Sequence, residues 1–386
     1  MPAPQTPIRG RGTAINPHNR FAPTRSFVED DGWYQDETPV TRATEVRLET
    51  AKTIIARNQS PDVGFDWSVN PYRGCEHGCV YCFARPSHAY WDLSPGIDFE
   101  TRLIAKTNLA DRLEAELSKP NYVPQPIALG INTDGYQPIE REYQLTRKAL
   151  EILLRYRHPV SIITKGSLIL RDLDLLVPLA EQNLVSVAFS LTTLNDELKR
   201  IMEPRAASPG ARLRAMRTLH EHGVPVHVMT APIIPMINDM ELEAMLEAAR
   251  DAGARSAGYV LLRLPHEIAD LFEDWLRNHF PDRANHVMSL IRQSRGGKNY
   301  DSQFGTRMRG QGQFADLLAQ RFKLAKRRLG LDGRTESGLD CSRFAPPGSQ
   351  MGLFQWLARW QMRRHDSDSS LPPLSSFKQL MRRLSH

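Results

Sequence analysis

The sequence is poor in cysteine and has no long apolar run. Its 386 residues include four cysteines, too few for a disulfide framework, so we expect free thiols in a reducing compartment. No stretch of about 18 apolar residues occurs, and the first residues, MPAPQTPIRGRG, lack the apolar core of a signal peptide. Hydrophobic residues make up 41% of the chain, enough for a full core. These features predict a globular cytoplasmic protein without a membrane-spanning segment.

Positive charge is scarce in the first three quarters of the chain and abundant in the last. The net charge of +6 combines −6 for residues 1–282 with +12 for residues 283–386, where 19 Lys or Arg face 7 Asp or Glu. Part of the excess lies in RFKLAKRRLG (321–330) and RWQMRRH (359–365). Such a patch is typical of proteins that bind nucleic acid or another polyanion. A solvated helix face followed by a frayed tail would give the same pattern.

Composition divides the chain into three regions. Residues 1–60 are rich in Pro, Arg, Thr and Asn and show no sustained period, which predicts an extended arm that wraps the domain or is partly disordered. Residues 61–282 show the alternating pattern of a folded core. Residues 283–386 form a basic C-terminal extension, predicted to be helical with a disordered end.

In the core, short apolar segments alternate with amphipathic ones. The apolar segments predict strands at 65–70, 126–132, 160–165, 184–190, 224–231 and 256–264. The amphipathic segments predict helices at 106–117, 145–156, 172–182, 209–222, 240–252 and 267–279. This order predicts an α/β fold of six β/α units with a mainly parallel sheet. An open doubly wound sheet and a partial barrel both satisfy the pattern.

In either architecture, ligands bind at the carboxyl ends of the strands. The segment NPYRGCEHGCVYCFARP (70–86) directly follows the first strand and so lies at this end. Thr133 and Asp134 follow the second strand, Lys165 ends the third, and Ser190 ends the fourth. We expect a site built from these side chains.

Three of the cysteines, Cys75, Cys79 and Cys82, have the spacing C-x3-C-x2-C. A structural zinc site normally takes four protein ligands from two separated pairs. Here His77 or His88 would have to supply the fourth from the same short loop. Three buried thiols without a ligand are a further alternative. A 4Fe-4S cluster fits better, because three thiolates leave one iron open for an outside ligand.

The pattern C-x3-C-x-aromatic-C after the first strand resembles the signature of the radical S-adenosylmethionine (radical SAM) superfamily. The segments SPGIDFE, YQPIE, TKGSLILRDLDLL, EPRAASPGARL and LRLP resemble the branch grouped with spore photoproduct lyase, and especially its bacterial members without assigned reactions. The resemblance runs from RGRGTAINPHNRF (9–21) to about residue 314. It implies a partial (β/α)6 TIM-like barrel with an N-terminal arm and a basic helical C-terminal extension.

The resemblance also implies the cofactors. Cys75, Cys79 and Cys82 match the cysteines that hold a 4Fe-4S cluster, whose open iron binds the amino and carboxylate groups of S-adenosylmethionine. In the superfamily, one electron from the reduced cluster cleaves this cofactor to a 5′-deoxyadenosyl radical, which abstracts hydrogen from a substrate. An electron donor such as flavodoxin or ferredoxin is implied as a partner.

Three residues match positions that lie beside the adenine or the amino group of S-adenosylmethionine in relatives. Tyr81 matches the aromatic position near the adenine, or it shields the cluster from solvent. Thr133 and Asp134 match a short polar motif that faces the amino group. Asp, Gly and Pro are also turn residues, so TDGYQP equally predicts a turn.

Three more residues match or resemble cofactor-binding positions. Lys165 matches a lysine that reaches the carboxylate of S-adenosylmethionine, and Ser190 matches a serine that contacts the cofactor. Both could instead be solvated strand ends. Arg205, in EPR, is a second candidate for the carboxylate because a guanidinium binds it through two hydrogen bonds. An ion pair with Glu203 is the alternative.

Two departures separate the chain from spore photoproduct lyase. The lyase returns hydrogen to its product through a cysteine inside the barrel, whereas no cysteine lies between Cys82 and Cys341 here. The lyase also has tyrosines on both sides of its third cluster cysteine, and here Phe83 takes the second position. We therefore do not expect thymine-dimer splitting by the same route. Cys341 could fold back as a hydrogen donor or a ligand, or be an ordinary thiol in the tail.

The sequence thus predicts a radical SAM enzyme, with the lyase or transferase subclass left open. Its substrate is predicted to be nucleic acid, as in a DNA repair photolyase-like reaction. Modification of a peptide or small metabolite is an alternative. A non-catalytic iron-sulfur or zinc protein that binds nucleic acid is the rival from another class.

Overall fold

The computed structural model describes residues 8, 10–21, 43–333 and 338–347. The chain divides into two units, Met1–Phe344 and Ala345–His386, and the fold and site below belong to the first. The predicted disordered end of the C-terminal extension, with RWQMRRH, lies outside the described residues. Within the described ranges, no helix is long and apolar enough to cross a membrane.

A seven-stranded sheet forms the centre of the unit, in the order β10-β9-β8-β7-β6-β3-β2. Six strands run parallel, and β2 pairs with β3 in the antiparallel direction. In the described part, β10 and β2 are the two edges and do not pair with each other. The strands are β2 (Ile55–Arg57), β3 (Trp67–Val69), β6 (Ile127–Leu129), β7 (Val160–Thr164), β8 (Val185–Ser190), β9 (Val226–Ile233) and β10 (Ser256–Leu261). This open arrangement confirms the predicted partial barrel.

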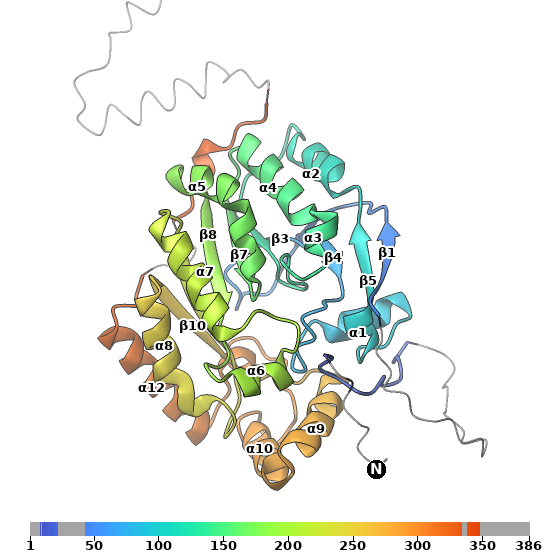
Figure 1. The fold of residues 1–386 in the computed structure, drawn as a ribbon, viewed down its shortest axis with the longest axis vertical. Helices are drawn as coiled ribbons and strands as arrows, with labels where there is room; N and C mark the ends of the chain where they lie inside the picture. Colours follow the sequence, from blue (N-terminus) through green and yellow to red (C-terminus); the bar gives the residue numbers. More distant parts are fainter. Residues whose placement is uncertain (1–7, 9, 22–42, 334–337, 348–386) are drawn as a thin grey trace, which may run out of the picture. The chain divides into compact units, whose positions relative to one another are not determined.

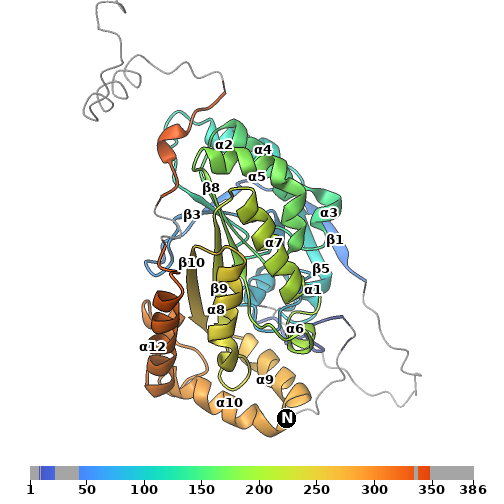
Figure 2. The same ribbon diagram turned by 60° about the vertical axis from the view of Figure 1, so that its left-hand side comes forward.

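The strands are buried because helices cover them. Val160, Val185, Val187 and Phe189 are fully inaccessible, as expected for parallel strands that read as continuous apolar runs. Figures 1 and 2 show α4, α5, α7 and α8 side by side along the sheet. The larger helices are α2 (Leu109–Leu117), α4 (Leu145–Arg155), α5 (Leu173–Glu181), α7 (Pro209–Glu221), α8 (Leu242–Asp251), α9 (Ile268–His279), α10 (Pro281–Gln293) and α12 (Gln313–Arg328).

Short helical turns connect these elements. They are η1 (Arg85–Trp91), α1 (Asp98–Thr101), α3 (Glu140–Tyr143), η2 (Ser167–Asp172), α6 (Asp196–Met202), η3 (Asp239–Glu241), α11 (Thr306–Arg309) and η4 (Cys341–Arg343). The helix α12, which carries the basic segment RFKLAKRRLG, contacts α8 and β10. Part of the predicted helical C-terminal extension is therefore packed on the barrel.

A second sheet was not foreseen from the sequence. It contains β1 (Glu45–Glu49), β5 (Arg102–Lys106) and β4 (Tyr72–Arg73) in the order β1-β5-β4. Together with β2, strand β1 lies in the region predicted as an arm without regular structure. The helix predicted at 106–117 is also shorter, because Lys106 ends β5 and α2 begins at Leu109. The sequence EVRLE is too polar to predict a strand alone, and β1 is fixed by its parallel ladder with β5.

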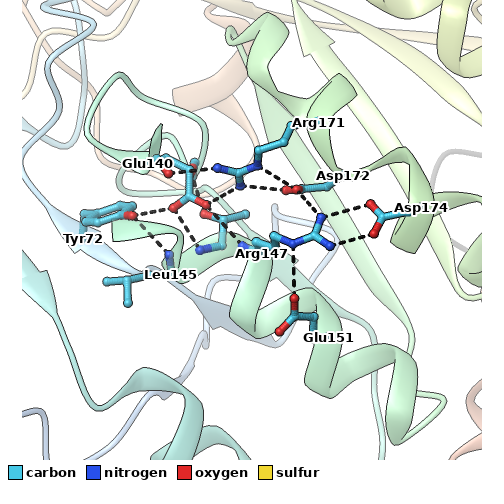
Figure 3. A network of polar contacts seen from close by, with 10 residues as sticks. Tyr72, Glu140, Leu145, Arg147, Glu151, Arg171, Asp172 and Asp174 are labelled. Atoms are coloured by element: carbon cyan, nitrogen blue, oxygen red, sulfur yellow. Dashed lines mark hydrogen bonds and ion pairs between the residues drawn. The ribbon is translucent and has the colours of Figure 1, made fainter. Parts of the chain in front are cut away.

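A buried polar network joins β4 to the helices beside it (Figure 3). The carboxylate of Glu140 accepts hydrogen bonds from Tyr72 Oη, from the Thr146 backbone and from Arg171. Arg171 also binds Asp172, at 2.8 Å from Nε to Oδ1. Glu140 and Asp172 are fully buried and lie in YQPIE and TKGSLILRDLDLL. These are two of the segments whose sequences resemble the radical SAM branch named above. Their buried carboxylates hold the neighbouring helices in place.

Candidate active site

A cavity of about 520 Å³ lies at the carboxyl ends of the parallel strands, where the sequence predicts a site. Eight of the nine predicted site residues line it: Cys75, Cys79, Tyr81, Cys82, Thr133, Asp134, Lys165 and Ser190. They come from the loop after β3 and β4 and from the ends of β6, β7 and β8. The fold therefore brings side chains from distant parts of the sequence to one place.

The three cysteines of this cavity lie in one tight loop and are free thiols. Gly78 has φ of +66°, a conformation that favours glycine, and a Cβ there would lie 2.7 Å from Glu100 Oε2. Among the described residues, no three His, Cys, Asp or Glu side chains converge closely enough to hold a single metal ion. Three separate thiols around a cavity fit an iron-sulfur cluster, in which each thiolate binds a different iron.

Burial controls the protonation of these thiols. It raises the pKa of Cys75 well above the usual value of a thiol. It also raises the pKa of Cys79 to about 12, although the charge of Lys165 opposes the shift. Without a ligand both groups are therefore protonated at neutral pH, and binding of iron must release their protons.

The N-terminal segment covers the outer side of the cysteine loop. The buried carboxylate of Glu100 accepts hydrogen bonds from the backbone N–H groups of Gly12 and Thr13, at 2.8 and 3.1 Å. It also pairs with Arg85 at 2.6 Å, and Arg85 Nε donates to the carbonyl of Cys79 at 2.9 Å. One buried carboxylate thus links residues 12 and 13 to the cysteine loop.

Asp134 closes a turn and also faces the cysteine loop. Its carboxylate accepts hydrogen bonds from the backbone N–H groups of Tyr136 and Lys165 and from Thr164 Oγ1, at 2.7–2.9 Å. Its Oδ2 lies 3.3 Å from Nδ1 of His77, which is buried and lacks an aligned hydrogen-bond partner. Burial alone would raise the pKa of Asp134, but His77 and these donors hold it well below its usual range. His77 is a site residue that sequence reasoning treated only as a zinc ligand.

Lys165 is half-buried and lines the cavity. Its ammonium lies 5.8 Å from the centroid of the Tyr81 ring. Burial would lower the pKa of Lys165, but the thiolate form of Cys79 and the carboxylate of Glu203 raise it overall. The side chain is therefore a cation positioned to meet an anionic group in the cavity.

Behind Lys165, the fully buried Glu203 accepts hydrogen bonds from Tyr81 Oη, Arg212 Nη2 and Thr192 Oγ1. Burial would raise the pKa of Glu203, but the charges of Arg212 and Lys165 lower it to about 2. This network holds the ring of Tyr81 in place. In the sequence Tyr81 lies between Cys79 and Cys82 of the cysteine loop.

Comparison with known proteins gives the family. The profile of the Radical SAM superfamily matches residues 69–249. An uncharacterised protein of Mycobacterium bovis is 39% identical over 242 residues, covering 61% of this chain and 71% of that protein. An uncharacterised protein of Methanocaldococcus jannaschii is 30% identical over 196 residues, covering 51% and 70%. The chain belongs to the radical SAM superfamily.

The solved structures agree with this assignment at the level of fold. Spore photoproduct lyase complexed with dinucleoside spore photoproduct superposes with a TM-score of 0.52 at 14% identity, covering 74% of this chain and 78% of that one. The predicted superfamily, its partial-barrel fold and the enzyme class are thus confirmed. The predicted cofactors, a 4Fe-4S cluster and S-adenosylmethionine, are those of radical SAM enzymes, and this prediction is confirmed as well.

Arg205 is the predicted site residue that the fold leaves outside the cavity lining of this radical SAM enzyme. Its guanidinium pairs with Glu76 at 3.1 Å, and its backbone N–H donates to the carbonyl of His77. The alternative pair with Glu203 does not form, because Arg212 from α7 occupies that carboxylate. Arg212 was missed since its contact depends on where α7 packs, with Arg212 Nη1 also donating to the carbonyl of Ser190 at the end of β8.

Cys341 lies far from the cavity in this radical SAM fold. The backbone N–H of Asp340 donates to the carbonyl of Asn183, which precedes β8. Phe344 packs on the ring of His158, which precedes β7. Cys341 is therefore at the amino ends of the strands, opposite the cysteine loop, and the hypothesis that it folds back as a hydrogen donor is wrong.

Proposed function

We propose that Cys75, Cys79 and Cys82 hold the 4Fe-4S cluster of this radical SAM enzyme and that Lys165 and Ser190 hold S-adenosylmethionine beside it. The observation that carries the proposal is the convergence of three free thiols and a half-buried cation, Lys165, on one cavity. When bound, the reduced cluster and S-adenosylmethionine together supply a carbon radical, the 5′-deoxyadenosyl radical, that abstracts hydrogen. Flavodoxin or ferredoxin in the cytoplasm is the proposed source of the electron.

The protein's own residues position these groups. The ammonium of Lys165 suits the carboxylate of S-adenosylmethionine, since it is desolvated and faces no carboxylate within ion-pair distance among the described residues. Thr133 and Asp134 line the cavity beside Lys165, whose backbone N–H donates to the Asp134 carboxylate, and an anionic carboxylate suits an amino group. Tyr81, held by Glu203, lies beside them and excludes water.

The proposed substrate is a nucleic acid strand. The basic helix α12 and the excess of Lys and Arg after residue 282 support it, because such surfaces attract polyanions. The structural neighbour that binds a dinucleoside photoproduct has the same fold. Among the described residues, the cysteines of the cavity are the three proposed ligands, so hydrogen return through a further cysteine is not part of the proposal.

Anaerobic reconstitution with iron and sulfide, followed by reduction with dithionite, tests the proposal. With S-adenosylmethionine added, we expect 5′-deoxyadenosine by liquid chromatography. With deuterated oligonucleotide present, we expect deuterium in that product. A reconstituted cluster that yields no 5′-deoxyadenosine would refute the enzyme chemistry. Label transferred from a peptide or metabolite, and none from nucleic acid, would refute the substrate alone.

A further inference from the structure

Arg263 lies in the cavity wall. Two other poorly exposed guanidinium groups have carboxylate partners: Arg85 pairs with Glu100, and Arg307 pairs with Asp62. Arg263 forms no ion pair with any carboxylate of the described residues. Its Nη1 contacts Met308 Sδ at 2.9 Å, and a thioether is a weak acceptor. The Tyr300 side chain is a further polar partner, so the guanidinium lines the cavity with a thioether and a phenol beside it and no carboxylate among the described residues.

The surroundings of Arg263 are aromatic and partly desolvated. Its guanidinium carbon lies 5.4 Å from the ring centroid of Phe83, next to Cys82, and 6.0 Å from that of Tyr300. Its Nε is buried without a hydrogen-bond partner. Burial lowers the pKa of this guanidinium. Because burying a cation without a counter-ion costs free energy, an anionic ligand at this position would remove the penalty.

Arg295 fixes the position of this wall. Its guanidinium is buried and donates to the carbonyls of Leu261 and Leu262 at 2.9 and 2.7 Å, immediately before Arg263. It also donates to the carbonyls of Thr306 and Arg307 at 3.1 and 2.8 Å. The end of β10 and the helix α11 are thereby held together. The carbonyls satisfy hydrogen bonds but carry no net charge, so Arg295 adds to the positive potential at Arg263.

This wall lies at the open side of the barrel. The lining includes Arg57 from the edge strand β2, and Arg263 directly beyond the other edge strand, β10. Arg307 also lines it and reaches Asp62, in the loop between β2 and β3. Among the lining residues described, Asp134 is the single carboxylate, and its oxygens are engaged by backbone and threonine donors. Among the described residues, Arg57 and Arg263 have no carboxylate partner while Asp62 pairs with Arg307, so the gap between the edges has an excess of positive charge.

Resting on the proposed nucleic acid substrate, we propose that Arg263, flanked by Arg57 and Arg307, binds a backbone phosphodiester where the strand enters the cavity between β2 and β10. A guanidinium matches a phosphate through paired N–H donors. Phe83 and Tyr300 beside it offer faces on which a base can stack. The phosphate supplies the counter-ion that no carboxylate of the described residues provides to Arg263.

Binding of a fluorescein-labelled thymidine hexanucleotide to the reconstituted enzyme tests this site by fluorescence anisotropy over a range of salt concentrations. The comparison strand has neutral methylphosphonate linkages. We expect it to bind at least about tenfold more weakly, since charge-assisted contacts and counter-ion release are lost. Equal binding of the two strands would overturn the proposal without any variant having to fold.

Three variants place the contact at Arg263. Arg263→Gln should weaken binding about tenfold and reduce the slope of log K against log salt by about 0.7, the value for one phosphate on a single strand. Arg263→Lys should keep the slope and lose part of the affinity, because it keeps the charge and loses the paired donors. Arg250→Gln removes an exposed cation of α8 and should change neither.

The outcomes separate this site from the proposed function. An unchanged slope in Arg263→Gln overturns the phosphate contact. Loss of S-adenosylmethionine binding in that variant, with strand binding intact, shows that the cofactor carboxylate is the anion and also overturns it. If wild-type protein binds neither strand but forms 5′-deoxyadenosine, the proposals of a nucleic acid substrate and of a phosphate site are refuted, and the proposal of radical chemistry is supported.

Discussion

Arg307 forms a two-point ion pair with Asp62 across the open side of the barrel. Nε of Arg307 lies 2.6 Å from Oδ2, and Nη2 binds Oδ1 of the same carboxylate. The two residues are separated by 245 positions in the sequence. The pair joins the short helix α11 to the loop before β3. It therefore connects two parts of the cavity wall that the sheet does not connect.

Asp62→Asn tests this link. The substitution leaves the charge of Arg307 beside Arg263 without a carboxylate, so we expect the free energy of unfolding to fall by about 1–3 kcal/mol. Urea unfolding followed by circular dichroism measures the change. Asp251→Asn is the matched control, because its pair with Arg250 is largely exposed and should contribute about 0–1 kcal/mol. Equal losses in the two variants would contradict a structural link at the gap.

Cys79→Ala and Cys341→Ala form a second matched pair. Cys79→Ala removes a thiol of the cavity and should abolish both stable cluster binding and formation of 5′-deoxyadenosine. Cys341→Ala changes a thiol at the opposite end of the strands and should retain both. Iron and sulfide content and the absorbance of the reconstituted protein measure the cluster. Full iron content in Cys79→Ala would refute the assignment of the ligands.

Gly12→Ala tests the contact between the N-terminal segment and the cysteine loop. A Cβ at Gly12 would lie 1.8 Å from the carbonyl oxygen of Gly78, so the segment must move away. Glu100 would then lose buried donors, at a cost of about 1–3 kcal/mol. We also expect faster bleaching of the cluster in air. Gly210→Ala is the control, because its nearest contact would be an ordinary 3.5 Å. Unchanged stability and bleaching in Gly12→Ala would contradict this role.

His158 predicts how stability depends on pH. It is fully buried and accepts a hydrogen bond at Nε2 from Tyr122 while Nδ1 faces the carbonyl of Pro159, an arrangement that suits the neutral ring. Burial lowers the pKa of His158 to about 4 from an ordinary value of 6.5. The unfolded chain therefore binds a proton first, and stability is lost as pH falls from about 6.5 towards 4.

His158→Gln removes this contribution. Between pH 7 and pH 5, wild-type protein should lose about 2 kcal/mol more than the variant, from the two pKa values. Urea unfolding at both pH values measures the difference. His222→Gln is the control, since His222 is exposed. Parallel losses in wild type and His158→Gln would show that the ring is not held neutral by the fold.

The parts of the fold that could be predicted are those with a strong local pattern. Val160, Val185 and Val187 lie in apolar runs that remain buried on both faces, so their strands were located to within a few residues. The three cysteines were located as a ligand set because their spacing is local. The order of strand ends along a parallel sheet then predicted which polar side chains share the cavity.

The parts that could not be predicted depend on contacts between distant segments. The sequence offered Arg205, two residues away, as an alternative ion-pair partner of Glu203, whereas packing of α7 places Arg212 on that carboxylate. The strand β1 is polar and forms because its backbone pairs with that of β5 in the parallel direction. The cationic wall of Arg263 and Arg307 is created by α11 lying beside β10, a contact that has no local signal in the sequence.

The hydrogen bonds from Gly12 and Thr13 to Glu100 also set an order of events during biosynthesis. Residues 12 and 13 leave the ribosome first, the cysteine loop follows, and Glu100 comes last. The covering segment therefore cannot settle until the loop and its anchor have both been made. In that interval the three thiols are already synthesised and their outer side is still uncovered.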